Sequence, residues 1–367
     1  MTEQELSAYI QAIRPADEAA MEAARRRQAQ LAKPPGSLGQ LEEISIRLAG
    51  VTGQVCPAMG KCRVAVFAAD NGVVAEGVSC TPPAVTMQQA VNMTFRKTGM
   101  SAMAAAFGDD VSVVDVGIDG DVPPVGVLGR KVRRGTGDIA REDAMTRQQV
   151  LDAMAAGMEQ AARARADGVT ALGIGEMGIG NTTTSAAVLA ALTGADIEAV
   201  TGRGGGLTDE GFLRKKEVLR QALALHRPDG SDVIGVLAGV GGLDLAAMTG
   251  AFLGCAHERV PAAVDGFISI AAALCAVRLC PAVRDVLFLS HDSYEVGYRI
   301  AAETLGLQPC LRLGMRLGEG SGCPLLFRVL EGACGVMRGM ATFGEASIED
   351  SYLDEIRAMD AFTVEGA

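Results

Sequence analysis

Three glycine-rich segments of the sequence place carboxylates, hydroxyls and a lysine where they could serve nucleotide chemistry. The first runs from Gly173 to Thr184 and reads GIGEMGIGNTTT. It lies between an apolar run and a helix expected over 185–192, and backbone N–H groups at a helix N-terminus bind anions. We interpret this segment as a phosphate cradle. A plain strand-to-helix turn capped by Asn181 or Thr182 would fit the same residues.

The same segment also matches a dinucleotide fingerprint. Gly173, Gly175 and Gly178 have the G-x-G-x-x-G spacing, and acidic residues follow about twenty positions later. Taken alone, this match favours a nicotinamide-dependent dehydrogenase. Glu176 weakens that interpretation, because its charge inside the loop would face a pyrophosphate.

The other two segments each hold one charged group among glycines. Residues 202–209 read GRGGGLTD and are followed by Lys215, so a glycine loop and a cation could approach a phosphate or a ribose. Residues 313–322 read LGMRLGEGSG and hold Glu319 between two glycines, before an apolar helix expected over 323–337. That helix end would favour the ionised carboxylate, whereas burial would raise its pKa. Such a residue suits a general base, although a simple helix-end charge fits the same pattern.

Short apolar runs alternate with helical stretches and must position these segments. The runs are continuous rather than alternating, as in buried parallel strands, and lie at 63–69, 111–116, 169–174, 261–264 and 286–289. Helices separate most of them, which is the βαβ pattern. Polar residues and glycines follow nearly every run, at the edge where open α/β sheets bind ligands. The sequence therefore predicts a Rossmann-like, mostly parallel sheet flanked by helices.

The chain ends are predicted to be helical. Helices are expected over 3–13 and 16–32, and we predict a small helical subdomain over 1–55, joined by 345–367, beside an α/β catalytic domain over 56–344. Two capping boxes predict further helix starts. They pair Ser37 with Gln40 and Thr146 with Gln149, and the helices would span about 38–49 and 147–166.

Composition excludes several classes of function. The 367 residues include 33 basic and 44 acidic ones, and the net charge of −11 argues against a nucleic-acid binder. Glycines and Asp244 interrupt the most apolar stretch, 233–256, so we expect two buried helices joined at Gly241-Gly242 and no membrane span. Nine cysteines without a C-x-x-C pair and three scattered histidines indicate reduced thiols and no metal site. An acidic N-terminus without a signal segment predicts a cytoplasmic protein.

Taken together, several long motifs resemble the nicotinate-nucleotide–dimethylbenzimidazole phosphoribosyltransferases of cobamide assembly. They come in the family's order and span nearly the whole chain: KPPGSLGQLE (33–42), FAADNGVVAEGVS (67–79), GIGEMGIGNTTTSAA (173–187), DGFISIAAAL (265–274) and MRLGEGSG (315–322). The resemblance implies transfer of ribose 5-phosphate from nicotinate mononucleotide to 5,6-dimethylbenzimidazole or a related base, giving α-ribazole 5′-phosphate and nicotinate. It also implies a homodimer, and it implies no metal or redox cofactor.

The resemblance assigns roles to individual residues. Glu319 matches the catalytic glutamate, which would take a proton from the incoming base, and Glu176 matches a second active-site glutamate that would stabilise or orient the ribose. The phosphate and ribose are expected at Gly178, Asn181, Thr182, Thr183, Gly204, Lys215, Ser293 and Arg316. The aromatic base is expected near Thr81, Gln89, Met177 and Leu317.

Asn71 departs from the family pattern, because many relatives read A-D-H-G where this chain reads A-D-N-G at 69–72. It lies near the base-binding segment, so the choice among benzimidazoles, purines and phenols stays open. The other remaining alternative is a non-catalytic nucleotide-binding paralogue. The presence of both Glu176 and Glu319 argues against it, because binding alone requires no general base.

Overall fold

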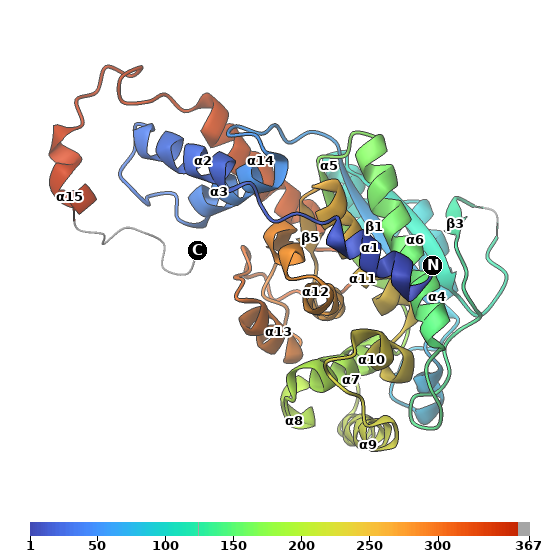
Figure 1. Cartoon of the computed structure of the whole chain (residues 1–367). Helices are drawn as coiled ribbons and strands as arrows, with labels where there is room; N and C mark the ends of the chain where they lie inside the picture. The colour runs from blue at the N-terminus through green and yellow to red at the C-terminus, as the bar shows by residue number, and fades with distance from the viewer. Residues whose placement is uncertain (124, 359–367) are drawn as a thin grey trace.

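A parallel sheet lies at the centre of the molecule (Figure 1). The structure is a computed structural model, and it describes residues 1–123 and 125–358. In that part of the chain six strands pair, all in parallel, in the order β3-β2-β1-β4-β5-β6. They are β1 (Cys62–Ala69), β2 (Asp110–Gly117), β3 (Val127–Gly129), β4 (Ala171–Met177), β5 (Ala262–Val264) and β6 (Leu287–Leu289). This is the strand order of doubly wound nucleotide-binding sheets, so the predicted fold class is confirmed.

Burial explains why the strands are continuous apolar runs in the sequence. Every residue of β4, β5 and β6 is buried, as expected for strands covered on both faces. The predicted limits 169–174 were wrong for β4, which ends at Met177 and therefore includes Glu176. The sequence analysis missed β3, a short edge strand that pairs with Val113–Asp115 of β2 and carries too few residues for a visible pattern.

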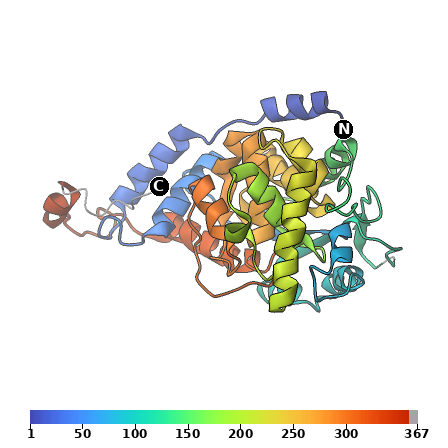
Figure 2. The same ribbon diagram turned by 90° about the horizontal axis from the view of Figure 1, so that it is seen from below.

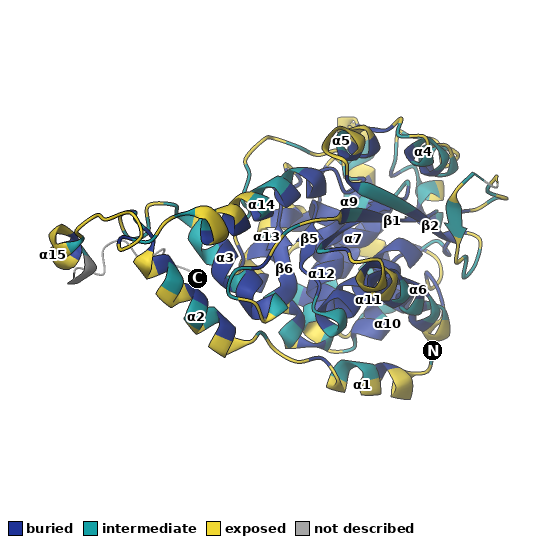
Figure 3. Ribbon diagram, turned by 90° about the horizontal axis from the view of Figure 1, so that it is seen from above, coloured by how far each residue is buried: buried dark blue, intermediate teal, exposed yellow. Residues whose placement is uncertain are grey.

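Helices cover both faces of the sheet (Figure 3). On one face lie α6 (Arg147–Ala166), α11 (Leu243–Glu258) and α12 (Phe267–Leu279), and on the other lie α5 (Gly99–Phe107) and α14 (Cys323–Gly339). The central helices α11 and α12 are buried along most of their length. The connections add η1 (Gly72–Glu76), α4 (Val85–Thr94), α7 (Asn181–Thr193), α8 (Ile197–Val200), α9 (Asp209–His226), α10 (Val233–Val240), η2 (Pro281–Val286) and α13 (Gly297–Leu305).

The N-terminal helices run along the outside of the molecule (Figure 2). Of these, α1 (Glu3–Gln11) packs on α11, and its Leu6 belongs to the main apolar core. By contrast, α2 (Glu18–Gln30) and α3 (Gln40–Thr52) pack on each other and on the C-terminal end of α14, where Met337 completes a second apolar cluster. The predicted helices at the start of the chain are therefore present.

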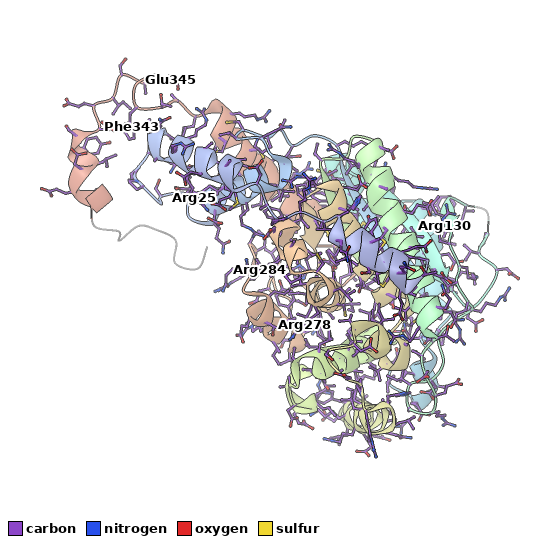
Figure 4. All side chains as sticks on the ribbon, in the orientation of Figure 1. Arg25, Arg130, Arg278, Arg284, Phe343 and Glu345 are labelled. Carbon is purple, nitrogen blue, oxygen red and sulfur yellow. The ribbon has the colours of Figure 1, made fainter. Side chains whose placement is uncertain are left out.

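The chain returns from α14 to α2 before it ends. The backbone N–H of Phe343 donates to the carbonyl of Gln30 at 3.0 Å, and Phe343 and Glu345 lie next to the end of α2 (Figure 4). Beyond them come η3 (Ser351–Leu353) and α15 (Asp354–Ala358). Residues 359–367 of the predicted subdomain lie outside the described residues, and the division into 1–55 with 345–367 and 56–344 stays a prediction.

Three predicted helix boundaries have different outcomes. The Thr146 capping box is confirmed, since Thr146 and Gln149 bond to each other's backbone at the start of α6. The Ser37 capping box was wrong, because α3 begins after Gly39, whose φ of 53° turns the chain into the helix. The apolar stretch 233–256 forms α10 and the greater part of α11, joined at Gly241-Gly242 as predicted. None of the helices within 1–123 and 125–358 has the length and apolar character needed to cross a membrane.

Helices α6 and α11 pack in unusually close contact because glycines face the other backbone. A Cβ atom on Gly157 would lie 1.8 Å from the carbonyl oxygen of Ala247, and one on Gly250 would lie 2.0 Å from that of Met154. Such contacts are possible only without side chains. Because α11 packs on β1, β2 and β4, this contact fixes one helix layer against the sheet.

We predict that Gly250→Ala destabilises the protein by about 3 kcal/mol, since the added methyl group must push two buried helices apart. Urea denaturation followed by circular dichroism measures this change. Gly335→Ala in α14 is the matched control, because a Cβ atom at Gly335 would meet no neighbouring heavy atom of the described residues within 4 Å. Alanine at position 335 should stabilise the helix by about 0.5–1 kcal/mol. Equal urea midpoints for Gly250→Ala and Gly335→Ala would contradict the close packing of α6 on α11.

Candidate active site

A cavity of about 280 Å³ opens at the carboxyl ends of β4, β5 and β6. The loops that follow these strands form its floor, and residues from 78–89, 203–207 and 316–319 form its sides. Most residues assigned from the sequence line this cavity, namely Thr81, Gln89, Glu176, Met177, Gly178, Asn181, Thr182, Gly204, Ser293, Arg316, Leu317 and Glu319. Segments far apart in the chain therefore meet at one edge of the sheet, as the strand pattern predicted.

Glu319 sits in a strained loop at the centre of this cavity wall. Its φ is 63°, and the flanking Gly318 and Gly320 have φ values of 79° and 83°. A non-glycine residue in this region costs on the order of 1–3 kcal/mol, so other contacts must hold it there. Asp265 supplies them, because its carboxylate accepts the backbone N–H of Gly320 at 3.0 Å and that of Gly322 at 2.6 Å.

The carboxylate of Glu319 lies against α5. Its Oε2 accepts the backbone N–H of Met100 at 3.2 Å, in the first turn of that helix. Burial raises the pKa of Glu319, and the hydrogen bonds from Thr98 and Met100 oppose that rise. The sequence analysis placed Glu319 at the N-terminus of the helix that follows it, and this was wrong. Asp265 instead accepts the backbone N–H of Gly322 at the N-terminal end of α14. The carboxylate of Glu319 is stabilised by the N-terminus of α5, which comes from another part of the chain.

Glu176 is the penultimate residue of β4, next to the Glu319 loop. Its Oε1 accepts the backbone N–H of Glu319 at 3.3 Å, and its Oε2 accepts the side-chain amide of Asn181. The same amide donates to Asp244 Oδ2 at 3.0 Å. Burial is the main cause that raises the pKa of Glu176, to about 8. The amide nitrogen of Asn181 therefore donates to two carboxylates, and the assignment of Asn181 to the phosphate and ribose stays a prediction.

Two of the assigned residues lie behind the cavity wall. Lys215 is fully buried, and its Nζ donates to Thr182 Oγ1 at 2.9 Å and to the carbonyl of Gly202 at 3.1 Å. Burial lowers the pKa of Lys215 to about 8. Lys215 therefore influences the cavity through its hydrogen bond to Thr182, which lines it. Thr183 is also fully buried, and its hydroxyl has no hydrogen-bond partner among the described residues.

Apolar side chains form another part of the cavity lining. Met177, Val85 and Phe267 are among them, and Leu317, which also lines the cavity, is 57% exposed. Gln89 adds an amide to this lining. Such a slot fits a flat aromatic ring with one or two hydrogen-bonding atoms.

Several residues of the site were missed by the sequence analysis. Asp265 holds the Glu319 loop, His291 lies with its Nδ1 3.0 Å from Ser290 Oγ and 3.8 Å from Asp265, and Glu295 lines the cavity. The available signal was their position directly after a predicted strand, where only Ser293 was chosen. Asp244 stood out in the sequence only as a charge within the apolar stretch 233–256, and that signal did not connect it with the site.

The G-x-G-x-x-G pattern has a packing role instead of the predicted cofactor role. Gly173 and Gly175 lie inside β4, before any loop. A Cβ on Gly175 would lie 2.7 Å from the carbonyl oxygen of Glu319, and one on Gly173 would lie 2.5 Å from Cys323 Cβ. These glycines let the Glu319 loop and α14 rest on the strand. The dehydrogenase interpretation depended on this pattern and therefore loses its support.

Comparison with known proteins agrees with this geometry. A family model described as phosphoribosyltransferase matches residues 13–348. A Clostridium perfringens (strain 13 / Type A) protein named nicotinate-nucleotide–dimethylbenzimidazole phosphoribosyltransferase is 46% identical, over 93% of this chain and 94% of its own length. The chain belongs to this phosphoribosyltransferase family.

Other members of the phosphoribosyltransferase family are equally similar. The protein of the same name from Geobacter metallireducens is 45% identical over 94% of this chain and 98% of its own length. A crystal structure described as CobT from Thermus thermophilus superposes with a TM-score of 0.88 at 44% identity, covering 91% of this chain and all of the other. The resemblance drawn from the motifs is confirmed, and the alternatives of a dehydrogenase and a non-catalytic paralogue are not favoured.

No group of three or more His, Cys, Asp or Glu residues in the described part of the chain is arranged to hold a metal ion. The charged groups of the site instead hold one another and the backbone. The clearest example is Asp265, which follows β5 and holds the Glu319 loop, because both of its oxygens accept backbone N–H groups.

We predict that Asp265→Asn lowers the rate of the family's phosphoribosyl transfer roughly 10–100-fold, because a displaced catalytic group costs rate more than binding. The amide would turn an N–H toward the loop where an acceptor is needed. Steady-state kinetics should show a lower kcat with a smaller change in KM. Asp292→Asn is the control, since Asp292 follows the neighbouring strand and pairs with the exposed Arg299. Equal effects of the two variants would contradict the role of Asp265.

Proposed function

We propose that the protein transfers ribose 5-phosphate from nicotinate mononucleotide to a nitrogen of a benzimidazole-type base, with Glu319 as the general base. The observation that carries this proposal is the position of the Glu319 carboxylate. It is buried in the cavity wall, is held by the N-terminus of α5, and lies in a strained loop between two glycines. Strain of this kind persists where the surrounding structure fixes a functional group.

The reaction requires one base and no acid. The bond from ribose C1′ to the pyridinium nitrogen breaks, and its electron pair neutralises that nitrogen, so nicotinate leaves without a proton. One nitrogen of the incoming base bonds to C1′, and the other loses its proton to Glu319. Because burial raises the pKa of Glu319 above that of an exposed glutamate, it is a stronger proton acceptor once ionised.

We assign the phosphate of the substrate to the start of α7. Backbone N–H groups at a helix N-terminus favour an anion, and Thr182 offers a hydroxyl that already accepts from buried Lys215. Gly204 and Ser293 lie on the same wall. Arg203 and Arg316 line the cavity as further cations. A protein with a net charge of −11 can bind a phosphorylated nucleotide with such local groups.

We assign the aromatic base to the slot near Thr81, Gln89, Met177 and Leu317. The base is 5,6-dimethylbenzimidazole or a related lower ligand, and competition among benzimidazoles, purines and phenols in one reaction would rank them. The N–H group of the base must come within reach of Glu319, which follows Leu317 and Gly318 in the same loop.

We predict that Glu319→Gln lowers kcat by roughly 100-fold or more, because general-base catalysis typically contributes 10²–10⁴-fold. Nicotinate release from nicotinate mononucleotide and 5,6-dimethylbenzimidazole, followed by chromatography, measures the rate. Binding of the mononucleotide by calorimetry should stay nearly unchanged. Glu331→Gln on α14 is the control, since it only pairs with Arg328 near the surface. Wild-type rates for Glu319→Gln would disprove its role as the general base.

We also propose that the protein is a homodimer. Large apolar side chains are exposed on two loops that contribute residues to the cavity, with Tyr294 at 69%, Leu313 at 57%, Leu317 at 57% and Val296 at 55%. They come from the loop after β6 and from the loop that carries Glu319. A second copy of the chain would cover this patch, as the sequence resemblance implies.

We predict that a Tyr294→Ser, Leu313→Ser double variant shifts the protein toward monomer in size-exclusion chromatography with light scattering. Removing two exposed apolar side chains weakens an interface that buries them. Leu213→Ser on α9 is the control, because Leu213 is 66% exposed but is not part of this patch. A dimer of unchanged stability in the double variant would place the interface elsewhere.

We further propose a reducing, cytoplasmic location. The nine cysteines are free thiols, and six of them are buried. Burial raises the pKa of Cys62 and Cys275 to about 12, which keeps both as unreactive thiols.

A further inference from the structure

Glu176 and Asp244 form a buried pair of carboxylates that share one amide group. We propose that Asp244, which does not line the cavity, keeps Glu176 protonated, so that Glu176 meets the substrate as a hydrogen-bond-donating carboxylic acid. The inference rests on the proposed function, because it concerns what Glu176 does during turnover. It makes Asp244 a positioning residue for the reaction and leaves Glu319 as the one proton acceptor.

The geometry brings the two carboxylates together with little between them. Asn181 Nδ2 donates both to Glu176 Oε2 and to Asp244 Oδ2. Asp244 is fully buried and Glu176 is 7% exposed, so both carboxylates lie in a low-dielectric environment. A Cβ on Gly178 would lie 2.6 Å from Asp244 Oδ2, which shows how closely the loop after β4 covers Asp244.

No cation compensates for this pair. Among the described residues, no Lys, Arg or His nitrogen lies within 4.0 Å of Glu176 or Asp244, as the ion pairs of the structure show. The loop after β5 adds Asp265, whose Oδ1 lies 3.8 Å from the Nδ1 of His291. The loop before α14 adds Glu319, which bonds to Glu176 through its backbone.

Lys215 and Glu295 are two further charged groups near the cavity. Lys215 on α9 bonds to Thr182 and Gly202, and the negative charge of Glu295, from the loop after β6, acts on it. Two buried carboxylates that share one amide group cannot both ionise at low cost, so the pair retains a proton at neutral pH.

The hydrogen bonds decide which carboxylate holds the proton. Asp244 Oδ1 accepts the backbone N–H of Leu245 at 2.9 Å, whereas Glu176 Oε1 accepts the backbone N–H of Glu319 at the longer distance of 3.3 Å, so the ionised form is better stabilised at Asp244. Burial raises the pKa of Asp244 to about 6, and burial together with the charge of Asp244 raises that of Glu176 to about 8. Between these values Asp244 is the anion and Glu176 is the acid.

A protonated Glu176 has a defined use at the cavity wall. It can donate a hydrogen bond to a ribose hydroxyl oxygen, which positions the sugar without adding a negative charge beside the phosphate. It does not compete with Glu319 for the proton of the incoming base. An ionised Glu176 could only accept a hydrogen bond from a ribose hydroxyl and would bring a negative charge, so the two forms differ in their pH dependence.

The first test observes the proton directly in the full-length protein without substrate. Infrared difference spectra of wild type against Glu176→Gln assign the band of the protonated Glu176 carboxyl group. We expect the band at about pH 7 and its loss as the pH rises through about 8. In Asp244→Asn the band should be lost about one pH unit lower, because a neighbouring negative charge is removed. Absence of the band at pH 7 in wild type would overturn the proposal without any need for the Asp244 variant.

The second test follows kcat/KM for nicotinate release from about pH 6 to about pH 10. Wild type should lose activity above about pH 8. At that pH, kcat/KM divided by its maximal value should be roughly fivefold lower for Asp244→Asn than for wild type. Asp109→Asn is the matched control, since Asp109 is also buried but pairs with Arg328 next to the start of β2, at the opposite edge of the sheet. It should leave the profile unchanged.

The two tests separate this inference from the proposed function. An unchanged pH profile in Asp244→Asn, or an equal loss of rate at every pH, would overturn the inference and indicate a purely structural Asp244. If wild type released no nicotinate while the infrared titration followed expectation, the proposed function would fail and the proton assignment would stand.

Discussion

The bidentate contact of Asp265 with the backbone of Gly320 and Gly322 is the constraint on which the site depends. It holds three consecutive residues at positive φ, and only such a turn places the Glu319 carboxylate inside the cavity. The contact also couples the site to the sheet. Asp265 follows β5, and the loop it holds rests on Gly175 of β4. Removing any of these elements would release the strained residue.

The electrostatics of the site follow from burial rather than from ion pairs. An acidic protein here places several carboxylates in one low-dielectric cavity, and the buried Lys215 donates to the Thr182 hydroxyl from behind the cavity wall. Backbone N–H groups, helix N-termini and amides therefore compensate the charges. Each carboxylate therefore has its own environment. Glu319 lies at the N-terminus of α5, and Glu176 shares the Asn181 amide with Asp244. Different environments allow chemically identical groups to take different roles.

Much of the fold could be predicted because burial leaves a local trace. Continuous apolar runs marked five of the strands, and Thr146 with Gln149 marked the start of α6 from neighbouring residues alone. The errors arose where distant contacts decide the outcome. Edge strand β3 is defined by its pairing with β2. Helix α3 has Gly39 and not Ser37 as its N-cap, because the conformation of the preceding loop decides where the helix begins. Among the site residues, those in motifs were found, whereas His291 and Asp244 were not.

The sequence by itself determined the family and the sheet class and singled out Glu176 and Glu319 as candidates, because long motifs and apolar runs are properties of neighbouring residues. Only the tertiary structure decided what surrounds those glutamates. It placed Glu319 on α5 rather than on its own following helix, turned Gly173 and Gly175 into packing surfaces, and put Asp244 beside Glu176. The physical reason is that the pKa and orientation of a buried group depend on atoms within a few ångströms, and these come from segments far apart in the chain.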